Sequence, residues 1–207
     1  MFRSFIVPFL GEYQNTFPNA ILDIRRNERD PILQAIRKQE IDAGFIVMPI
    51  QLSELGEAIR FEQVCSSYLE LICSPENELA QKETIALDDL NGQKYCLFND
   101  ESHDYVFDQL QYMCGPLPLI LRSDDSWAIH EAIIRKNAVC FSRVMLSQVS
   151  RENTFDDLRS VSIKHLVDAN SHMGWVTNTQ KPLSNAALTL ISLITEQIKK
   201  DTAEAVS

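Results

Sequence analysis

Residues 30–48 read DPILQAIRKQEIDAGFIVM, a stretch that predicts one helix followed by one buried strand. Asp30 has the side chain of a helix N-cap, and Pro31 suits the first helical position, where its missing N–H costs no hydrogen bond. The unbroken apolar run 45–48 is typical of a strand buried on both faces. A further short strand is expected at Ala20–Arg25, so the order strand, helix, strand predicts a β-α-β unit.

Amphipathic helices are expected at both ends of the chain. The first should end before Phe17-Pro18, because the residue that precedes a proline disfavours helical geometry. Its apolar face is formed by Phe2, Phe5, Ile6, Phe9, Leu10 and Tyr13. The closing helix has one apolar face, which is formed by Leu183, Ala187, Leu190, Ile191, Ile194 and Ile198.

The middle of the chain alternates between strand and helix patterns. Strands are expected at Ile59–Val64 and Tyr68–Cys73, and the polar stretch after the second marks a change of lobe. From Lys94 a second α/β unit follows. Its strands are Tyr95–Phe98, Leu119–Arg122 and Ala138–Ser142, its helices are Asp104–Met113 and Ser126–Arg135, and two later strands are Leu158–Ile163 and Met173–Thr177. The fold class is therefore α/β.

Composition limits what this chain binds and where it works. Its 207 residues are 45% hydrophobic, which is enough for a core, and the formal net charge of -10 repels phosphate backbones. Direct binding to nucleic acid by this chain is not expected. No run approaches the ~18 apolar residues that span a membrane, and the opening apolar run is too short for a signal peptide. Five cysteines, an odd number without a C-x-x-C pair, fit a reduced cytoplasmic compartment.

Several weak motifs occur in an order that identifies a family. The strand ILDI, the helix PILQAIRKQE and the run IDAGF at 41–45 are followed by LELICSPENELA and later by SDDSWAIHEAIIRKNAVCFS. A segment GWVTN and a final amphipathic helix close the chain. Together these motifs resemble the effector-binding domain of LysR-type transcriptional regulators over nearly the whole chain.

The resemblance implies two Rossmann-like lobes with a ligand cleft between them, as in type-II periplasmic binding proteins. Lobe I would comprise 1–72 and 177–200, lobe II would comprise 73–176, and 201–207 would be a disordered tail. The chain starts at the family's first helix, so lobe I is expected to lack its N-terminal strand, and the DNA-binding helix-turn-helix is also expected to be missing. Asn137 stands where the family has a glycine turn and would supply a positive φ.

The family further implies a homodimer that binds a small organic effector without a cofactor, a metal or a reaction, and an anion would suit the N–H donors at helix starts. In lobe I, Ser4 stands where the family has hydroxyl side chains that contact the ligand. The alternative is that Ser4 only caps its helix. Arg29 and Asp30 match a loop that faces the cleft. Arg29 would pair with a carboxylate or point into solvent, and Asp30 would contact the ligand or, as the favoured reading, cap its helix.

In lobe II, the candidate ligand-binding residues follow the carboxyl ends of strands. This is the general position at which open α/β sheets bind their ligands. Asn99 and Ser102 come after the first strand, and Ser102 is the best single candidate. Ser123 and Ser126 come after the second strand, where Ser126 would cap the next helix, contact the ligand, or do both. Phe141 and Ser142 end the third strand, with a core position as the alternative for the aromatic ring.

The cysteines and histidines are predicted to have structural roles. Cys96 and Cys140 lie in apolar strands and are predicted to be packed thiols. The histidines show no metal-ligand spacing and are predicted to be exposed or hydrogen-bonded. No nucleophile elbow or phosphate loop is present, which disfavours an enzyme. An enzyme or a stand-alone solute-binding protein on the same two-lobed scaffold remains the alternative function.

Overall fold

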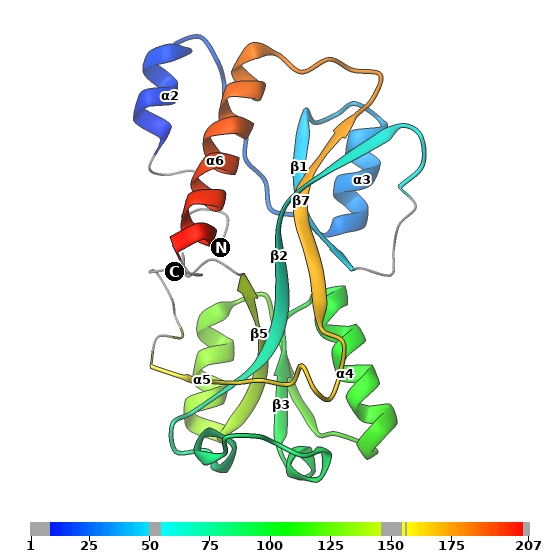
Figure 1. Ribbon diagram of the computed structural model, residues 1–207, viewed down its shortest axis with the longest axis vertical. Helices are drawn as coiled ribbons and strands as arrows, with labels where there is room; N and C mark the ends of the chain where they lie inside the picture. Colours follow the sequence, from blue (N-terminus) through cyan, green and yellow to red (C-terminus); the bar gives the residue numbers. More distant parts are fainter. Residues whose placement is uncertain (1–8, 50–54, 146–154, 156, 205–207) are drawn as a thin grey trace. The chain divides into compact units, whose positions relative to one another are not determined.

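The computed structural model describes residues 9–49, 55–145, 155 and 157–204 (Figure 1). The chain divides into two compact units. Unit 1 comprises residues 1–67, 145–152 and 171–207, and unit 2 comprises residues 68–144 and 153–170. The chain therefore leaves unit 1 a few residues before the boundary expected at residue 72, and it enters unit 1 again before the one expected at 177.

Unit 1 is a small sheet with a helix on each face. Its strands are β1 (Ala43–Pro49), β7 (Asn170–Asn178) and the first part of β2 (Ile59–Cys73), in the order β1-β7-β2. β1 pairs antiparallel with β7, with Ala43 opposite Thr177. The helices are α2 (Leu10–Thr16), α3 (Arg29–Arg37) and α6 (Asn185–Glu204).

Alternate residues of β1 and β7 face α3 on one side of the sheet and α6 on the other, as the period of two along a strand requires. Ile46 and Met48 pack with Leu33 and Ile36 of α3. On the other face a second cluster packs against α6, and it contains Phe45, Val47, Met173, Trp175, Ile194 and Ile198. The helix and the buried strand predicted from residues 30–48 are thus confirmed.

The prediction of a strand at Ala20–Arg25 is wrong. These residues have no regular secondary structure, and Ile21 and Ile24 are 96% and 49% exposed. The physical reason is the lack of a neighbour: β1 ends the strand order among the described residues, and none of them forms a strand beside 20–25. An isolated extended segment has no partner for its backbone N–H and C=O groups. Unit 1 therefore holds α3 and β1 without the first strand of the expected β-α-β unit.

The two terminal helices largely match their patterns. α2 ends at Thr16, where the Phe17 N–H donates to the Tyr13 carbonyl, so the predicted end is confirmed. The predicted start at Phe2 lies outside the described residues. α6 continues to Glu204, so residues 201–204 are helical instead of belonging to the disordered tail.

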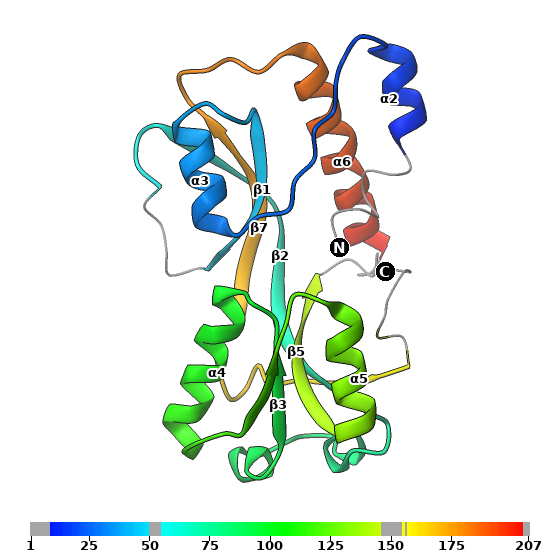
Figure 2. The ribbon, with the colours of Figure 1, turned by 180° about the vertical axis from the view of Figure 1, so that it is seen from behind.

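Unit 2 is the α/β unit predicted from Lys94 onward (Figure 2). β3 (Lys94–Leu97) lies between β4 (Leu119–Arg122) and β5 (Ala138–Met145) and is parallel to both. The second part of β2 extends the sheet beyond β5, and the short β6 (Arg159–Val161) pairs with it. Sequence patterns suggested two strands for β2, which is a single strand of 15 residues.

The helices α4 (Glu101–Cys114) and α5 (Ser126–Lys136) cover opposite faces of this sheet. Val106, Phe107 and Leu110 of α4 pack on one face, and Ile129 and Ile133 of α5 pack on the other. Two short 3-10 helices, Glu78–Gln81 and Leu87–Leu90, connect β2 to β3.

Asn137 adopts the left-handed conformation between α5 and β5, with φ of 51°. Its side-chain oxygen accepts a 3.1 Å hydrogen bond from Nδ2 of the buried Asn77. The prediction that Asn137 supplies the positive φ in this turn is confirmed, and the bond from Asn77 holds the turn in place.

Candidate ligand-binding site

The best-developed polar cluster of unit 2 lies after β3 and beside β5. Asp100 is the N-cap of α4: its Oδ1 accepts a hydrogen bond of 2.9 Å from the Ser102 N–H and a further one from the Ser102 hydroxyl. Arg143, on β5, donates from Nη2 to Ser102 Oγ at 2.6 Å, and the same nitrogen lies 3.7 Å from Asp100 Oδ1. The parallel pairing of β3 and β5 brings these loop and strand residues together.

The charges of this cluster balance inside the protein. The Arg143 side chain is only 7% exposed, and that of Asp100 is 37% exposed. Burial alone would raise the pKa of Asp100, but His103 in its protonated form at low pH, the charge of Arg143 and the hydrogen bonds from Ser102 outweigh it, so the pKa is lowered. Burial lowers the pKa of Arg143, and Asp100 opposes this. The pair is thus ionised, with Ser102 held between a cation and an anion.

Sequence reasoning selected Ser102 but missed Arg143. The sequence could have pointed to Arg143, because it directly follows Ser142 at the end of a predicted buried strand. A charged residue at such a position is unusual. Ser142 itself is half-buried, and Phe141 is fully buried in the cluster that contains Tyr95 and Leu97. The structure therefore places the Phe141 ring in the core, the alternative reading, and its contact with a ligand stays a prediction.

His103, in the first turn of α4, differs from the expected exposed or hydrogen-bonded histidine. It is 5% exposed, and within the described residues its Nδ1 has no hydrogen-bond partner. Its ring lies 5.6 Å from that of Phe98 and 6.3 Å from that of Phe141. Burial lowers the pKa of His103 to about 4, so the imidazole is neutral near pH 7. The helical position of the residue, on the inner face of α4, explains its burial.

Acidification from pH 7 to 4 is expected to destabilise the wild type more than a His103→Phe variant. The folded-state pKa of about 4 lies below the ordinary value of 6.5, so the unfolded chain binds more protons between these values. The contribution of neutral His103 to the free energy of unfolding is fully present above pH ~6.5 and is lost as the pH falls toward ~4. This loss amounts to roughly 3 kcal/mol. Urea unfolding across this range measures the difference, and parallel curves for the two proteins would refute the assignment.

The loop after β4 is arranged by Asp125. Asp125 is the N-cap of α5 and accepts from the Trp127 N–H at 2.9 Å, while its own N–H donates to Ser123 Oγ at 3.0 Å. The predicted capping role of Ser126 is therefore wrong. Ser126 is the first residue of the helix, because the carboxylate one residue earlier takes the cap. Asn99 Nδ2 donates to Asp124 Oδ2 at 3.1 Å and links this loop to the one after β3.

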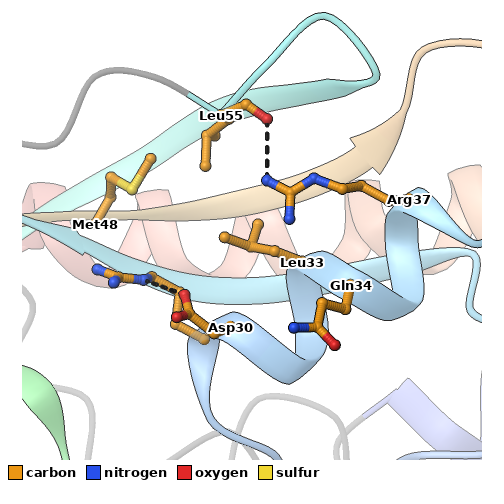
Figure 3. Close-up of a pocket in the computed structure, with 7 residues that line it drawn as sticks. Asp30, Leu33, Gln34, Arg37, Met48 and Leu55 are labelled. Carbon is orange, nitrogen blue, oxygen red and sulfur yellow. Dashed lines mark hydrogen bonds and ion pairs between the residues drawn. The ribbon is translucent and has the colours of Figure 1, made fainter.

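In unit 1, Arg29 and Asp30 line a pocket of about 270 Å³ over α3 (Figure 3). Gln34 and Arg37 supply its other polar groups, and Leu33, Met48 and Leu55 supply its apolar part. α3 starts at Arg29, and its N-cap Glu28 makes no side-chain cap hydrogen bond. Asp30 is therefore not the cap: it lies within the first turn, 3.4 Å from Nε of Arg29. Ser4 lies outside the described residues.

The cysteines of the chain are all free thiols. Cys96 and Cys140 lie opposite each other on β3 and β5 and are fully buried, which confirms them as packed thiols. Among the described residues, no three histidine, cysteine or acidic side chains gather closely enough to hold a metal ion. The described helices include none with the length and hydropathy of a membrane span.

The sequence matches a known protein family. The family model for the LysR substrate binding domain matches residues 1–199, so the chain belongs to that family. These residues hold the effector-binding part of a LysR-type regulator, and the match covers all but the last eight of them.

Solved structures of LysR-family regulators share the fold at low sequence identity. The Synechocystis PCC6803 CcmR regulatory domain, in complex with 2-PG, is 16% identical with a TM-score of 0.74, and the match covers 95% of this chain and 92% of that one. The effector-binding domain of QuiR, in complex with shikimate, is 10% identical with a TM-score of 0.67 and coverages of 94% and 90%.

A longer relative is the Corynebacterium glutamicum OxyR C206 mutant, which is 15% identical with a TM-score of 0.68. That match covers 98% of this chain but 63% of the OxyR chain. The present chain thus spans less than two thirds of that regulator. The α/β class and the periplasmic-binding-protein-like type of the fold are confirmed by these likenesses.

Proposed function

We propose that this chain senses a small organic acid for a LysR-type regulator, by binding it without making or breaking a bond. The observation that carries the proposal is the cluster of Asp100, Ser102 and Arg143 at the carboxyl end of a parallel strand, where open α/β sheets bind ligands. The Arg143–Asp100 pair holds Ser102 at the start of α4, where backbone N–H groups offer donors to an acidic group. The acids 2-PG and shikimate, bound to CcmR and QuiR, support the same ligand class.

The regulatory consequence would be a shift between conformations. A ligand changes such an equilibrium only by as much as its affinity differs between the two states. We propose that Asn99, Ser123, Ser126 and Ser142 surround the ligand in unit 2 together with Ser102. The domain would act in the cytoplasm as a homodimer, as the family resemblance implies, and its role would be binding without catalysis.

Ser102→Ala is expected to weaken binding of the recognised acid about tenfold, because the variant lacks the hydroxyl that links the ligand to Arg143. A thermal-shift screen of small organic acids, followed by titration of the best one, measures this. Ser102→Thr is the matched control and should retain binding, since it keeps the hydroxyl. Equal affinity in wild type and Ser102→Ala would remove Ser102 from the site. Turnover of a bound acid would overturn the sensing function.

A further inference from the structure

The charges that line the pocket over α3 are unequal. Arg29 has the Asp30 carboxylate beside it, with Nε and Oδ1 3.4 Å apart. Arg37 instead donates from Nη2 to the backbone carbonyl of Leu55 at 3.3 Å, a neutral acceptor, and it forms no ion pair with any described residue (Figure 3). The cation of this pocket that lacks a counter-charge among the described residues is therefore Arg37.

The position of Arg37 in the last turn of α3 explains part of its presence, because a cation there is stabilised by the helix dipole. The dipole does not explain why the side chain reaches toward Leu55 and lines a pocket. A guanidinium presents a planar fork of N–H donors that matches both oxygens of a carboxylate. A carboxylate is also a stronger acceptor for this cation than a neutral carbonyl.

The remaining lining of the pocket limits what accompanies the acidic group. Leu33, Met48 and Leu55 offer apolar contact, and the Gln34 amide offers one donor and one acceptor site. The volume of about 270 Å³ lies just below the range of ~300 to 1,000 Å³ typical of sites for drug-sized ligands. The occupant that fits is a small molecule with one acidic group and a short carbon body.

We propose that Arg37 anchors a small organic monocarboxylate in this pocket, exchanging the Leu55 carbonyl for the ligand carboxylate. Leu33, Met48 and Leu55 then cover the carbon part of the ligand. The inference rests on the proposed sensing function and deepens it: it names the ligand class and moves the anchor in unit 1 from Arg29, the residue selected from the sequence, to Arg37. Arg29 and Asp30 neutralise each other and shape the wall of the pocket.

The test uses the full chain labelled with ¹⁵N and titrated with phenylacetate and 3-methylbutanoate, each compared with its uncharged amide. Saturable shifts at residues around α3 are expected with the acids and not with the amides. Arg37→Gln should weaken acid binding at least tenfold. Lys38→Gln is the matched control, because it removes the same charge from the neighbouring position, which does not line the pocket. It should bind as the wild type does.

A second variant separates Arg37 from Arg29. In Arg29→Gln/Asp30→Asn the net charge of the pocket is unchanged, so acid affinity should stay within about threefold of wild type. Loss of binding in this double variant with retention in Arg37→Gln would overturn the assignment of Arg37 and leave the sensing function intact. Absence of binding by any acid to the wild type would overturn both proposals. Equal binding of acids and amides would overturn the carboxylate class.

Discussion

Gly174→Ala is expected to destabilise the protein by at least about 3 kcal/mol, the largest effect of any alanine substitution at its glycines. A Cβ at Gly174 would lie 2.1 Å from the carbonyl oxygen of Glu62 and 2.9 Å from the Cα of Gln63. Both atoms belong to the backbone of β2, so no side-chain rotation relieves the overlap. β7 would have to move away from β2, and the hydrogen bonds between them would be lost.

Two other glycines provide graded controls for this prediction. Around Gly11, in α2, an added Cβ meets nothing within 4 Å, so Gly11→Ala should stabilise the helix by ~0.5 to 1 kcal/mol. At Gly44 the nearest atom is a methyl of Ile32, 2.3 Å away, which belongs to a side chain that can shift. Urea unfolding followed by circular dichroism ranks the three variants. Stability of Gly174→Ala within 1 kcal/mol of Gly11→Ala would contradict the close approach of β7 and β2.

Arg143→Met is expected to lower the free energy of unfolding by roughly 2 to 3 kcal/mol. Removing one partner of a fully buried ion pair typically costs ~3 to 5 kcal/mol, because the other charge is left uncompensated. The cost here is reduced, since water reaches the Asp100 side chain, which is 37% exposed. Methionine fills most of the space of the arginine stem, so the loss reports mainly the charge and the hydrogen bond to Ser102.

A double-mutant cycle with Asp100→Asn separates the two contributions. Asparagine keeps the N-cap of α4, since its side-chain oxygen still accepts from the Ser102 N–H. The double variant Arg143→Met/Asp100→Asn should therefore be more stable than Arg143→Met alone, because no unpaired carboxylate remains. If the two variants unfold at the same urea concentration, Asp100 is not the counter-charge of Arg143.

Local patterns were sufficient to predict most elements of this fold. The strands and helices after Lys94 follow from alternating periods, because each element of unit 2 buries one face against its sequence neighbours. The strand at Ala20–Arg25 had the same apolar pattern and failed, since a strand also needs a neighbour for its backbone, which composition does not reveal. β2 was divided in the prediction because Ser66 and Ser67 interrupt its apolar run, although polar residues are tolerated in a paired strand.

The polar residues show the same limit at finer scale. Asp30 and Ser126 have the side chains of caps, but Glu28 and Asp125 occupy the N-cap positions because helices α3 and α5 start where the backbone turns. Arg143 was missed because its partners, Ser102 and Asp100, are some 40 residues earlier and meet it only through the pairing of β3 and β5. Arg37 was overlooked in favour of Arg29. Only the structure shows that Asp30 lies beside Arg29 and that Arg37 lines the same pocket.

β2 has a practical consequence for anyone who dissects this protein. Its residues up to Ser67 belong to one unit and those from Tyr68 to the other, within one uninterrupted strand. Since unit 1 also takes α6 from the far end of the chain, no single cut yields a self-sufficient fragment. Expression trials and limited proteolysis should treat the chain as indivisible, and a truncated product that stays in solution would need separate proof that it has a native core.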